Sequence, residues 1–298
     1  MKKLFCAAAC FCGLTMICTG NTLDPYKTNP WNLLKDKKYA DAEAVFNARI
    51  VDPACDKTLK KQAFHGIFGA YMTQKKQDAA LAAFDKYLAD PQLAEYKATF
   101  LEFKGRIYIA KGKVAEALVP LKEAAALTEG TAEQASPIRL AFTCAGINYK
   151  LLPEVSKLVD SVLANTNLHT NQLLLISASE TCWRLNRPAD GMRIARMAEQ
   201  NMKTPDSNVY RVLGYHLRSQ NEFEEAEKMF TKAIELSKSE ADKATLYRNI
   251  GENWERAQEY EKAIPFYQKA ADSPAKGWWT NAAKAKITSL KKKIEAGE

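Results

Sequence analysis

The chain has 298 residues, of which 47% are hydrophobic and 26% are charged, and its formal net charge is +8. This balance excludes an intrinsically disordered chain and fits a folded protein. With only 13 glycines and 11 prolines, the chain is also a poor candidate for an all-β fold with many tight turns. Alanine, leucine, lysine and glutamate dominate from Trp31 onward, and these helix formers predict a mostly helical protein.

Residues 1–20 have the features of a secretory signal. Two lysines precede an uncharged run over residues 4–19, which is shorter than the roughly 20 residues that span a bilayer as a helix. Cys18 and Gly20 stand at the −3 and −1 positions of a cleavage site at the end of this segment. We therefore expect an exported protein, periplasmic or secreted, with a signal peptide at 1–20 and a linker at 21–30.

Two other fates of this segment are open. The segment could stay uncleaved as a membrane anchor, or a cysteine in it could carry a lipid. The lipoprotein match is poor, because bulky Met16 and Ile17 precede Cys18, and almost no apolar segment precedes Cys10. In both cases the protein would be a membrane-tethered assembly factor, and it would meet a membrane only through this segment.

Removal of residues 1–20 leaves three cysteines, Cys55, Cys144 and Cys182, and a net charge of +6. Three scattered cysteines are no disulfide framework, since at most one pair can close. Whether any two of them form a disulfide stays open. The fold is expected to depend on apolar packing.

Three segments, at about 98–130, 207–238 and 244–275, share one spacing of small and large residues. In each segment a glycine and an alanine stand twelve residues apart, with large residues at fixed offsets around them. Small residues allow two helices to approach closely, and large residues three and four apart form one stripe on a helix. The positions that define the pattern are Gly105, Tyr108 and Ala117 in the first segment, Gly214, Ala226 and Phe230 in the second, and Gly251, Trp254, Ala263 and Tyr267 in the third.

Weaker copies occupy the rest of the chain. One covers Trp31 to Ile50 and another covers Phe64 to Phe84. Gly146 and Tyr149 open a further copy, and Leu173 to Asn201 form a degenerate one. We count about seven units up to Pro274, joined by loops of variable length.

The pattern resembles the tetratricopeptide repeat, a helical hairpin of roughly 34 residues. The resemblance implies an all-α fold over residues 31–298, a right-handed superhelix (α-solenoid) of about seven helix–turn–helix repeats. Ala283, Ile287, Leu290 and Ile294 follow a helical stripe between lysines. They predict a C-terminal capping helix at about 278–296, which covers the last apolar surface of such an array. Trp278 and Trp279 are expected to pack there, with docking onto a partner or a membrane as the alternative.

We find no pattern typical of an enzyme. His65, His169 and His216 are far apart and have no second ligand at metal spacing. Cys144 or Cys182 could pair with His169 as a nucleophile and base, but buried cysteines and a loop histidine are the simpler interpretation. We therefore expect no catalytic residue, no metal and no cofactor. A net charge of +6 after cleavage is modest, and no nucleic-acid partner is expected.

The family resemblance implies a groove whose inner wall is made by the first helix of each hairpin, and in which a peptide or protein partner lies. Arg211 and Asn249 fall where family members that clamp a C-terminal carboxylate carry a basic residue and an asparagine, whereas Tyr215 replaces a second asparagine. We expect a weakly acidic partner at Arg211, Tyr215, Arg218 and Arg248, and charge reversal of Arg211 and Arg248 should weaken its capture without unfolding the protein. The full set of inward candidates is Arg106, Lys150, Arg211, Tyr215, Arg218, Arg248, Asn249 and Arg256.

The function expected is a non-catalytic scaffold or adaptor of the cell envelope or the secreted space. The competing reading is a small-molecule-binding protein or enzyme with a pocket inside the superhelix. An enclosed polar cavity would favour that reading, and an open lined groove would favour the scaffold.

Overall fold

A computed structural model describes residues 23–275 and 277–297. Within these residues the chain forms fifteen α-helices and four short 3-10 helices, with no strand. The predicted signal peptide lies outside the described residues. The structure divides into two units, the first ending at Ala83 and the second beginning at Phe84.

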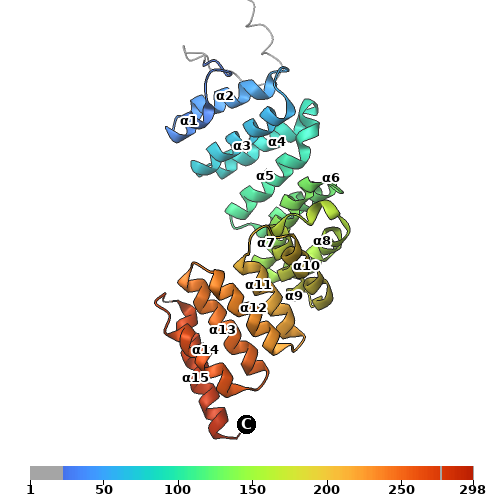
Figure 1. Cartoon of the computed structure of the whole chain (residues 1–298). Coiled ribbons are helices and arrows are strands. Elements are labelled where there is room, and N and C mark those ends of the chain that lie inside the picture. The colour runs from blue at the N-terminus through green and yellow to red at the C-terminus, as the bar shows by residue number, and fades with distance from the viewer. Residues whose placement is uncertain (1–22, 276, 298) are drawn as a thin grey trace, which may run out of the picture. The chain divides into compact units, whose positions relative to one another are not determined.

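The helices follow one another as seven helix–turn–helix pairs and a final single helix (Figure 1). This confirms the all-α fold of about seven repeats. The pairs are α1 (Pro30–Lys35) with α2 (Tyr39–Val51), α3 (Lys57–Thr73) with α4 (Gln77–Ala89), α5 (Lys97–Ala110) with α6 (Val114–Leu127), α7 (Ala135–Ile147) with α8 (Leu152–Ala164), α9 (Gln172–Arg184) with α10 (Pro188–Asn201), α11 (Ser207–Ser219) with α12 (Phe223–Leu236), and α13 (Glu240–Arg256) with α14 (Tyr260–Ala271). The single helix is α15 (Trp278–Glu295), and the 3-10 helices are η1 (Pro91–Tyr96), η2 (Ala132–Gln134), η3 (Tyr149–Leu151) and η4 (Thr166–Leu168).

In the second unit the hairpins stack in the order of the sequence. Each helix from α5 to α15 packs on helices that adjoin it in the chain, and Figure 1 shows α11 to α15 lying as successive layers. One continuous cluster of buried apolar side chains runs through this unit from Ala117 to Leu290. Stacked hairpins therefore share a single core, as expected for a repeat array.

Six of the seven hairpins use the same turn. Three residues join the two helices, and the middle residue has a left-handed backbone with φ between 55° and 73°. The third residue donates its backbone N–H to the carbonyl five residues earlier, at 2.8–3.0 Å. This arrangement satisfies carbonyls that the end of a helix leaves unpaired. The left-handed residues are Lys37, Lys75, Gly112, Asn186, Asn221 and Gln258.

The α7–α8 hairpin departs from this turn, and here the sequence-based prediction is wrong. Gly146 is the second-last residue of α7, and a Cβ on it would find only Nη1 of Arg184, at 4.0 Å. Tyr149 lies in η3 and is exposed. Gly146 therefore does not form the close helix contact predicted for the glycine position, because the packed face of α7 centres on the buried Ile138, Ala141 and Phe142.

The twelve-residue spacing has a direct structural cause in the other clear repeats. A Cβ on Gly105, Gly214 or Gly251 would lie 2.5–2.9 Å from a large side chain sixteen residues later, on the second helix of the same hairpin. Ala117, Ala226 and Ala263 are fully buried beside these contacts. Because glycine has no Cβ, a large side chain of the second helix packs directly against the backbone of the first helix. The side chains seated in this way are Leu121, Phe230 and Tyr267.

The α9–α10 hairpin achieves a similar fit with different residues. Ser179 stands in the place of the glycine, and Gly191 follows twelve residues later. The buried ring of His216, on α11, fills the space beside Gly191, where a Cβ would lie 2.1 Å from the ring. The Ser179 hydroxyl donates to the Gly191 carbonyl at 3.0 Å and lies 2.8 Å from Nε2 of His216. A polar contact thus ties α9, α10 and α11 together inside the core.

The last helix, α15, covers the end of the array at the position predicted for a cap. Ala283, Ile287 and Leu290 are buried, and α15 packs mainly on α14. Lys284, Lys291 and their neighbouring lysines lie on the exposed side. Across the described part of the chain, no helix combines the length and apolar character needed to cross a bilayer.

Candidate functional site

The strongest candidate site lies on the first helices of the last three hairpins. In α9, α11 and α13 the residues three before, one after and four after the small position share one side of each helix. On that side α9 carries Glu180 and Trp183, α11 carries Arg211, Tyr215 and Arg218, and α13 carries Arg248, Glu252 and Glu255. We call the set Glu180, Trp183, Arg211, Tyr215, Arg218, Arg248, Glu252 and Trp278 the aromatic–arginine face, because its contacts are continuous from α9 to α15.

Arg211 is held between α9 and α11. Its Nη2 lies 2.6 Å from Oε1 of Glu180 and 3.2 Å from Oδ1 of Asn208. Its guanidinium carbon lies 5.6 Å from the centre of the Tyr215 ring. Burial disfavours the charged form of Arg211, but Glu180 and Tyr215 outweigh it, so the pKa of Arg211 is raised above its usual value. The side chain is a preordered cation with 24% of its surface exposed.

Arg218 and Arg248 share one carboxylate. Nη1 of Arg218 lies 3.3 Å from Oε2 of Glu252, and Nη1 of Arg248 donates to Oε1 of the same residue. Both arginines are largely covered, with 11% and 20% of their side-chain surfaces exposed. One negative charge therefore lies between two positive charges.

Aromatic rings fill the space around these guanidinium groups. The Tyr215 ring stacks on Trp183 at 5.8 Å between centroids, and Arg218 lies 5.4 Å from the centre of the same ring. Arg248 lies 4.9 Å from the Trp278 ring at the start of α15. Trp183 and Trp278 remain 46% and 65% exposed. Two large apolar surfaces thus stand open to solvent on either side of the arginines.

The two positions compared with a carboxylate clamp are engaged inside the protein. Asn249 is 1% exposed and donates from Nδ2 to the Tyr215 hydroxyl at 3.0 Å. Arg211 is bound to Glu180, as described. These side chains serve the packing of α11 against its neighbours, and they are not arranged to receive a terminal carboxylate.

The remaining predicted groove residues lie apart from this cluster. Arg106 binds Glu102 on its own helix at 2.6 Å and Ser136 at 3.1 Å. Lys150 was placed on a first helix by its offset from Gly146, but it lies exposed in η3. Arg256 is the last residue of α13 and is exposed. The structure therefore brings together Arg211, Tyr215, Arg218, Arg248 and Asn249, but not the other three.

Sequence reasoning missed Glu180 and Trp183 as members of this surface. Both belong to the degenerate hairpin, in which Ser179 replaces the marker glycine, so no register was available there. The signal that could have found them is the offset of one and four residues from Ser179, which equals the offset of Tyr215 and Arg218 from Gly214.

Among the described residues, the cysteines are buried and ring nitrogens of the three histidines lie within hydrogen-bond distance of backbone carbonyls. All three described cysteines are free and buried, and burial raises the pKa of the Cys144 thiol to about 11 and that of Cys182 to about 12. A ring nitrogen of His169 lies 3.0 Å from a backbone carbonyl, that of Val162. No group of three or more histidine, cysteine or acidic side chains suited to a metal ion occurs in the part of the chain that the structure describes.

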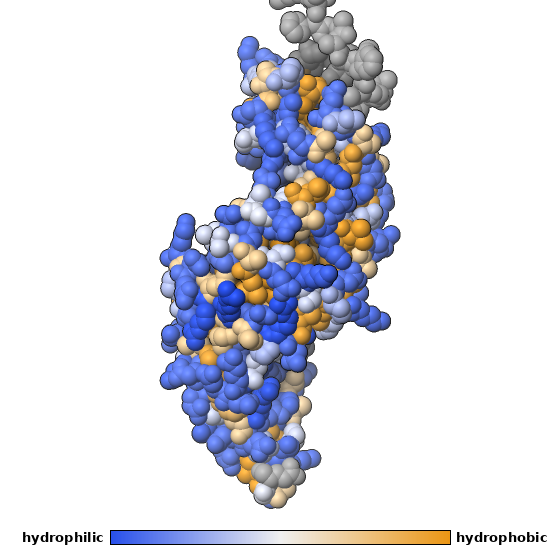
Figure 2. All heavy atoms as spheres, turned by 90° about the vertical axis from the view of Figure 1, so that its right-hand side faces the viewer, coloured by the Kyte–Doolittle hydropathy of each residue, from blue (hydrophilic) through white to orange (hydrophobic). Residues whose placement is uncertain are grey.

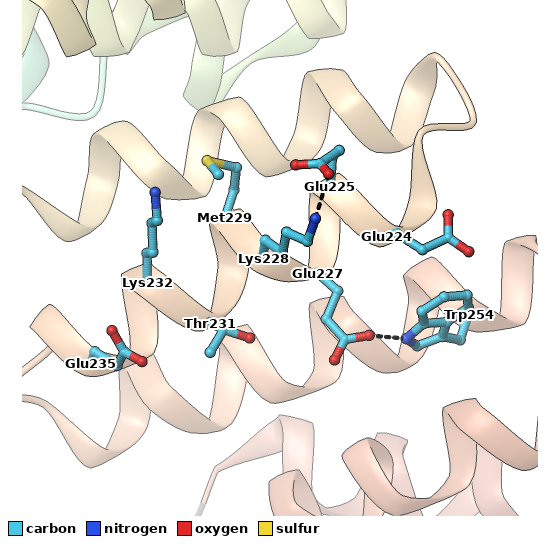
Figure 3. Close-up of a pocket in the computed structure, with 9 residues that line it drawn as sticks. All are labelled: Glu224, Glu225, Glu227, Lys228, Met229, Thr231, Lys232, Glu235 and Trp254. Carbon is cyan, nitrogen blue, oxygen red and sulfur yellow. Dashed lines mark hydrogen bonds and ion pairs between the residues drawn. The ribbon is translucent and has the colours of Figure 1, made fainter.

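An open depression of about 610 Å³ lies along α12 beside Trp254 of α13 (Figure 3). Two contacts join charged residues of its lining to their neighbours: Lys228 binds Glu225 at 2.6 Å, and the Trp254 indole donates to Glu227 at 2.5 Å. A smaller hollow of about 300 Å³ lies between α13 and the end of α14. Figure 2 shows one side of the molecule, on which hydrophilic residues predominate and hydrophobic residues form separate patches. Neither hollow is the enclosed cavity that a small-molecule site inside the superhelix would require.

Comparison with known proteins agrees with this architecture. Residues 206–273, which cover α11 to α14, match the tetratricopeptide repeat family model. A search of curated proteins found no match to the sequence.

Solved structures of low sequence identity share the fold. YrrB, described as a TPR protein with an unusual peptide-binding site, matches with a TM-score of 0.50 at 17% identity, over 68% of this chain and 98% of its own. BtubC (BKLC) from P. vanneervenii matches with a TM-score of 0.51 at 14% identity, over 66% and 87% of the two chains. The APC/C hetero-tetramer Cut9–Hcn1 matches with a TM-score of 0.50 at 11% identity, over 88% of this chain and 48% of that one. The described hairpins stack in sequence order, as in the solved tetratricopeptide repeat structures, and residues 206–273 match the tetratricopeptide repeat family itself.

Proposed function

We propose that this protein is a non-catalytic scaffold whose protein or peptide partner lies along the aromatic–arginine face. Tetratricopeptide repeat folds in general support protein–protein interaction. The observation that carries the proposal is the exposure of Trp183 and Trp278 beside arginines that are already held in place. Tryptophan and arginine are enriched among the residues that dominate binding energy at protein interfaces.

The arginine side chains are held in a fixed conformation, and this favours binding. Arg211, Arg218 and Arg248 are fixed by ion pairs and ring contacts before any partner arrives, so less side-chain entropy is lost on association. Two of the structural neighbours are also consistent with such a role, because one is described as having a peptide-binding site and another was solved within a hetero-tetramer.

The proposal can be tested by site-specific photo-crosslinking. A benzophenone amino acid at position 183 should capture a discrete partner from the native source, whereas the same group at position 228, an exposed position on α12 outside the aromatic–arginine face, should not. Substitution of these positions leaves the ion pairs of the face in place. The same products from both positions, or none from position 183, would contradict the proposal.

This design replaces the charge reversal expected from the sequence. Arg211 and Arg248 bind Glu180 and Glu252, so glutamate at either position would face a carboxylate in a partly buried site. Reversal would then destabilise the stack of α9, α11 and α13 as well as weaken capture, and the two effects would not separate.

We further propose that the protein is exported, as residues 1–20 predict, and acts in the cell envelope or the secreted space. Mass spectrometry of the mature N-terminus from the native host tests this. A terminus at Asn21 supports cleavage, a modified cysteine indicates a lipidated and membrane-tethered form, and an intact segment indicates an anchor or retention inside the cell.

A further inference from the structure

We propose that Arg218, Glu252 and Arg248 form a receptor for one carboxylate, supplied by an aspartate or glutamate side chain of the partner. The inference rests on the proposed function, and it specifies what the partner must present at one point of the aromatic–arginine face. It differs from the clamp considered from the sequence, because the two clamp positions, Asn249 and Arg211, are already bound to Tyr215 and Glu180.

The first argument is a count of charge. Arg218, on α11, and Arg248, on α13, each contact a different oxygen of Glu252. Arg211 has its own carboxylate, Glu180, at 2.6 Å. Glu255, the next acid along α13, accepts from the Tyr267 hydroxyl at 2.5 Å and from Lys286 at 2.7 Å. The pair Arg218 and Arg248 is therefore short of one negative charge.

The second argument is an unused donor. Nε of Arg248 is buried and has no hydrogen-bond partner among the described residues. A guanidinium offers five N–H donors, and a buried donor without a partner costs free energy. A carboxylate beside Trp278 would meet the part of the Arg248 side chain that stays exposed, 20% of its surface, and would offset the charge of a guanidinium whose buried Nε has no partner among the described residues.

The third argument selects the class of ligand. Arginines already lie over the rings of Tyr215 and Trp278, so an incoming cation would meet like charge there. A phosphoryl group carries a charge of about −1.5 to −2 at neutral pH, which exceeds the shortfall of one. A carboxylate matches it, and it pairs with guanidinium in a favourable planar geometry.

The experiment uses fluorescein-labelled nonapeptides of proline, leucine, alanine and serine that differ only at the central residue, which is glutamate, glutamine, lysine or phosphoserine. Binding to the full chain is measured by fluorescence anisotropy. We expect the glutamate peptide to bind about 10-fold more tightly than the glutamine peptide, as one added charge-assisted hydrogen bond gives. The Arg248 Nε–Hε resonance should shift with the glutamate peptide alone.

Matched variants locate the effect. Arg248→Gln should remove the preference for glutamate, and Glu252→Gln should increase it, because the competing carboxylate is lost. Lys228→Gln, on α12 outside the aromatic–arginine face and 63% exposed, should leave the preference unchanged. The opposite directions expected for Arg248→Gln and Glu252→Gln separate recognition from a general loss of folding.

The outcomes distinguish this inference from the proposed function. If all four peptides bind equally, and position 183 still crosslinks a partner, the carboxylate receptor is wrong and the scaffold stands. Tighter binding of the phosphoserine or lysine peptide also overturns the receptor, in favour of a different ligand class. If no peptide binds, the receptor is overturned, and failure of the crosslink removes the proposed function as well.

Discussion

At the scale of single residues, glycine sets how closely the two helices of a hairpin approach. Gly214 receives the edge of the Phe230 ring, and Gly251 and Gly105 receive Tyr267 and Leu121 in the same way. Each seated side chain is fully buried. Because protein interiors are close-packed, a single added methyl group at these positions has no space to enter.

Gly214→Ala should therefore destabilise the protein. The new Cβ would lie 2.6 Å from the Phe230 ring, and relief of such overpacking typically costs about 1–3 kcal/mol. Gly146→Ala is the matched control, because its Cβ would meet only Arg184 at 4.0 Å, and the free energy of unfolding should not fall. Urea denaturation of both variants measures the difference, and equal losses would refute the role given to Gly214.

A second residue-scale prediction concerns acid. His216 is fully buried, and because its Nε2 faces Ser179, the neutral tautomer leaves Nδ1 without a partner among the described residues. Burial lowers the pKa of His216 below its ordinary value of 6.5. The unfolded chain then binds a proton that the folded chain excludes, so the contribution of His216 is complete above pH 6.5 and is lost progressively as the pH falls below it.

The control for this effect is His216→Phe, which keeps a ring beside Gly191 but cannot titrate. We expect the free energy of unfolding of the wild type to fall more steeply between pH 7 and pH 5 than that of the variant. Parallel pH profiles would show that His216 does not supply the dependence. The sequence did not identify His216 as a core residue. No glycine marks the small position in α9, and His216 packs against Gly191 from the next helix, α11.

At the scale of the element, a glycine in the recurring three-residue turn and a glycine inside a helix should respond differently to substitution. Gly112 has φ of 73° in the α5–α6 turn, and Gly69 lies within α3, yet a Cβ at either position would meet nothing within 4 Å. Gly112→Ala should cost about 1–2 kcal/mol, because a side chain disfavours the left-handed backbone. Gly69→Ala should instead gain about 0.5–1 kcal/mol, because glycine weakens the interior of a helix. Thermal unfolding of the pair tests whether backbone conformation alone decides the sign.

The elements also show what the sequence could and could not predict. The three hairpins with a glycine under a large side chain were predicted in the correct register, because the twelve-residue interval from glycine to alanine accompanies that contact. The α7–α8 hairpin was not, because Gly146 and Tyr149 imitate the spacing while Val155, Val159 and Val162 form the buried stripe of its second helix. The longer connection through η3 changes the number of residues between equivalent positions of the two helices. A pattern that assumes a constant number therefore assigns the wrong positions here.

At the scale of the whole molecule, the cap maintains the end of the second unit. Leu290 is 1% exposed at the contact of α15 with the array, so Leu290→Ala should cost about 2–5 kcal/mol. Lys291→Ala, on the exposed side of the same helix, should change stability by less than about 0.5 kcal/mol. Denaturation together with analytical ultracentrifugation measures both effects, because a loosened cap should also expose apolar surface and promote self-association. A monomeric Leu290→Ala protein of unchanged stability would contradict the capping role.

The candidate site is also a property of the whole second unit. The sequence placed Arg211, Tyr215, Arg218 and Arg248 on one surface, since a repeat brings equivalent offsets together. The contacts between repeats were beyond its reach, because Glu180 with Arg211 and Glu252 with Arg218 join residues 31 and 34 positions apart. Only the stacking of neighbouring hairpins decides whether such pairs meet.

Because six hairpins share the same turn, one hairpin should be able to replace or follow another without a change in the connection between its helices. A protein in which residues 203–238 are duplicated in tandem should lengthen by one layer, since the new copy brings its own connection and its own glycine seat for Phe230. The α7–α8 segment should not be exchangeable in this way, because Asn148 and η3 connect its two helices in place of the three-residue turn. Insertion or deletion of a whole hairpin should therefore be tolerated far better between α9 and α14 than within the α7–α8 segment.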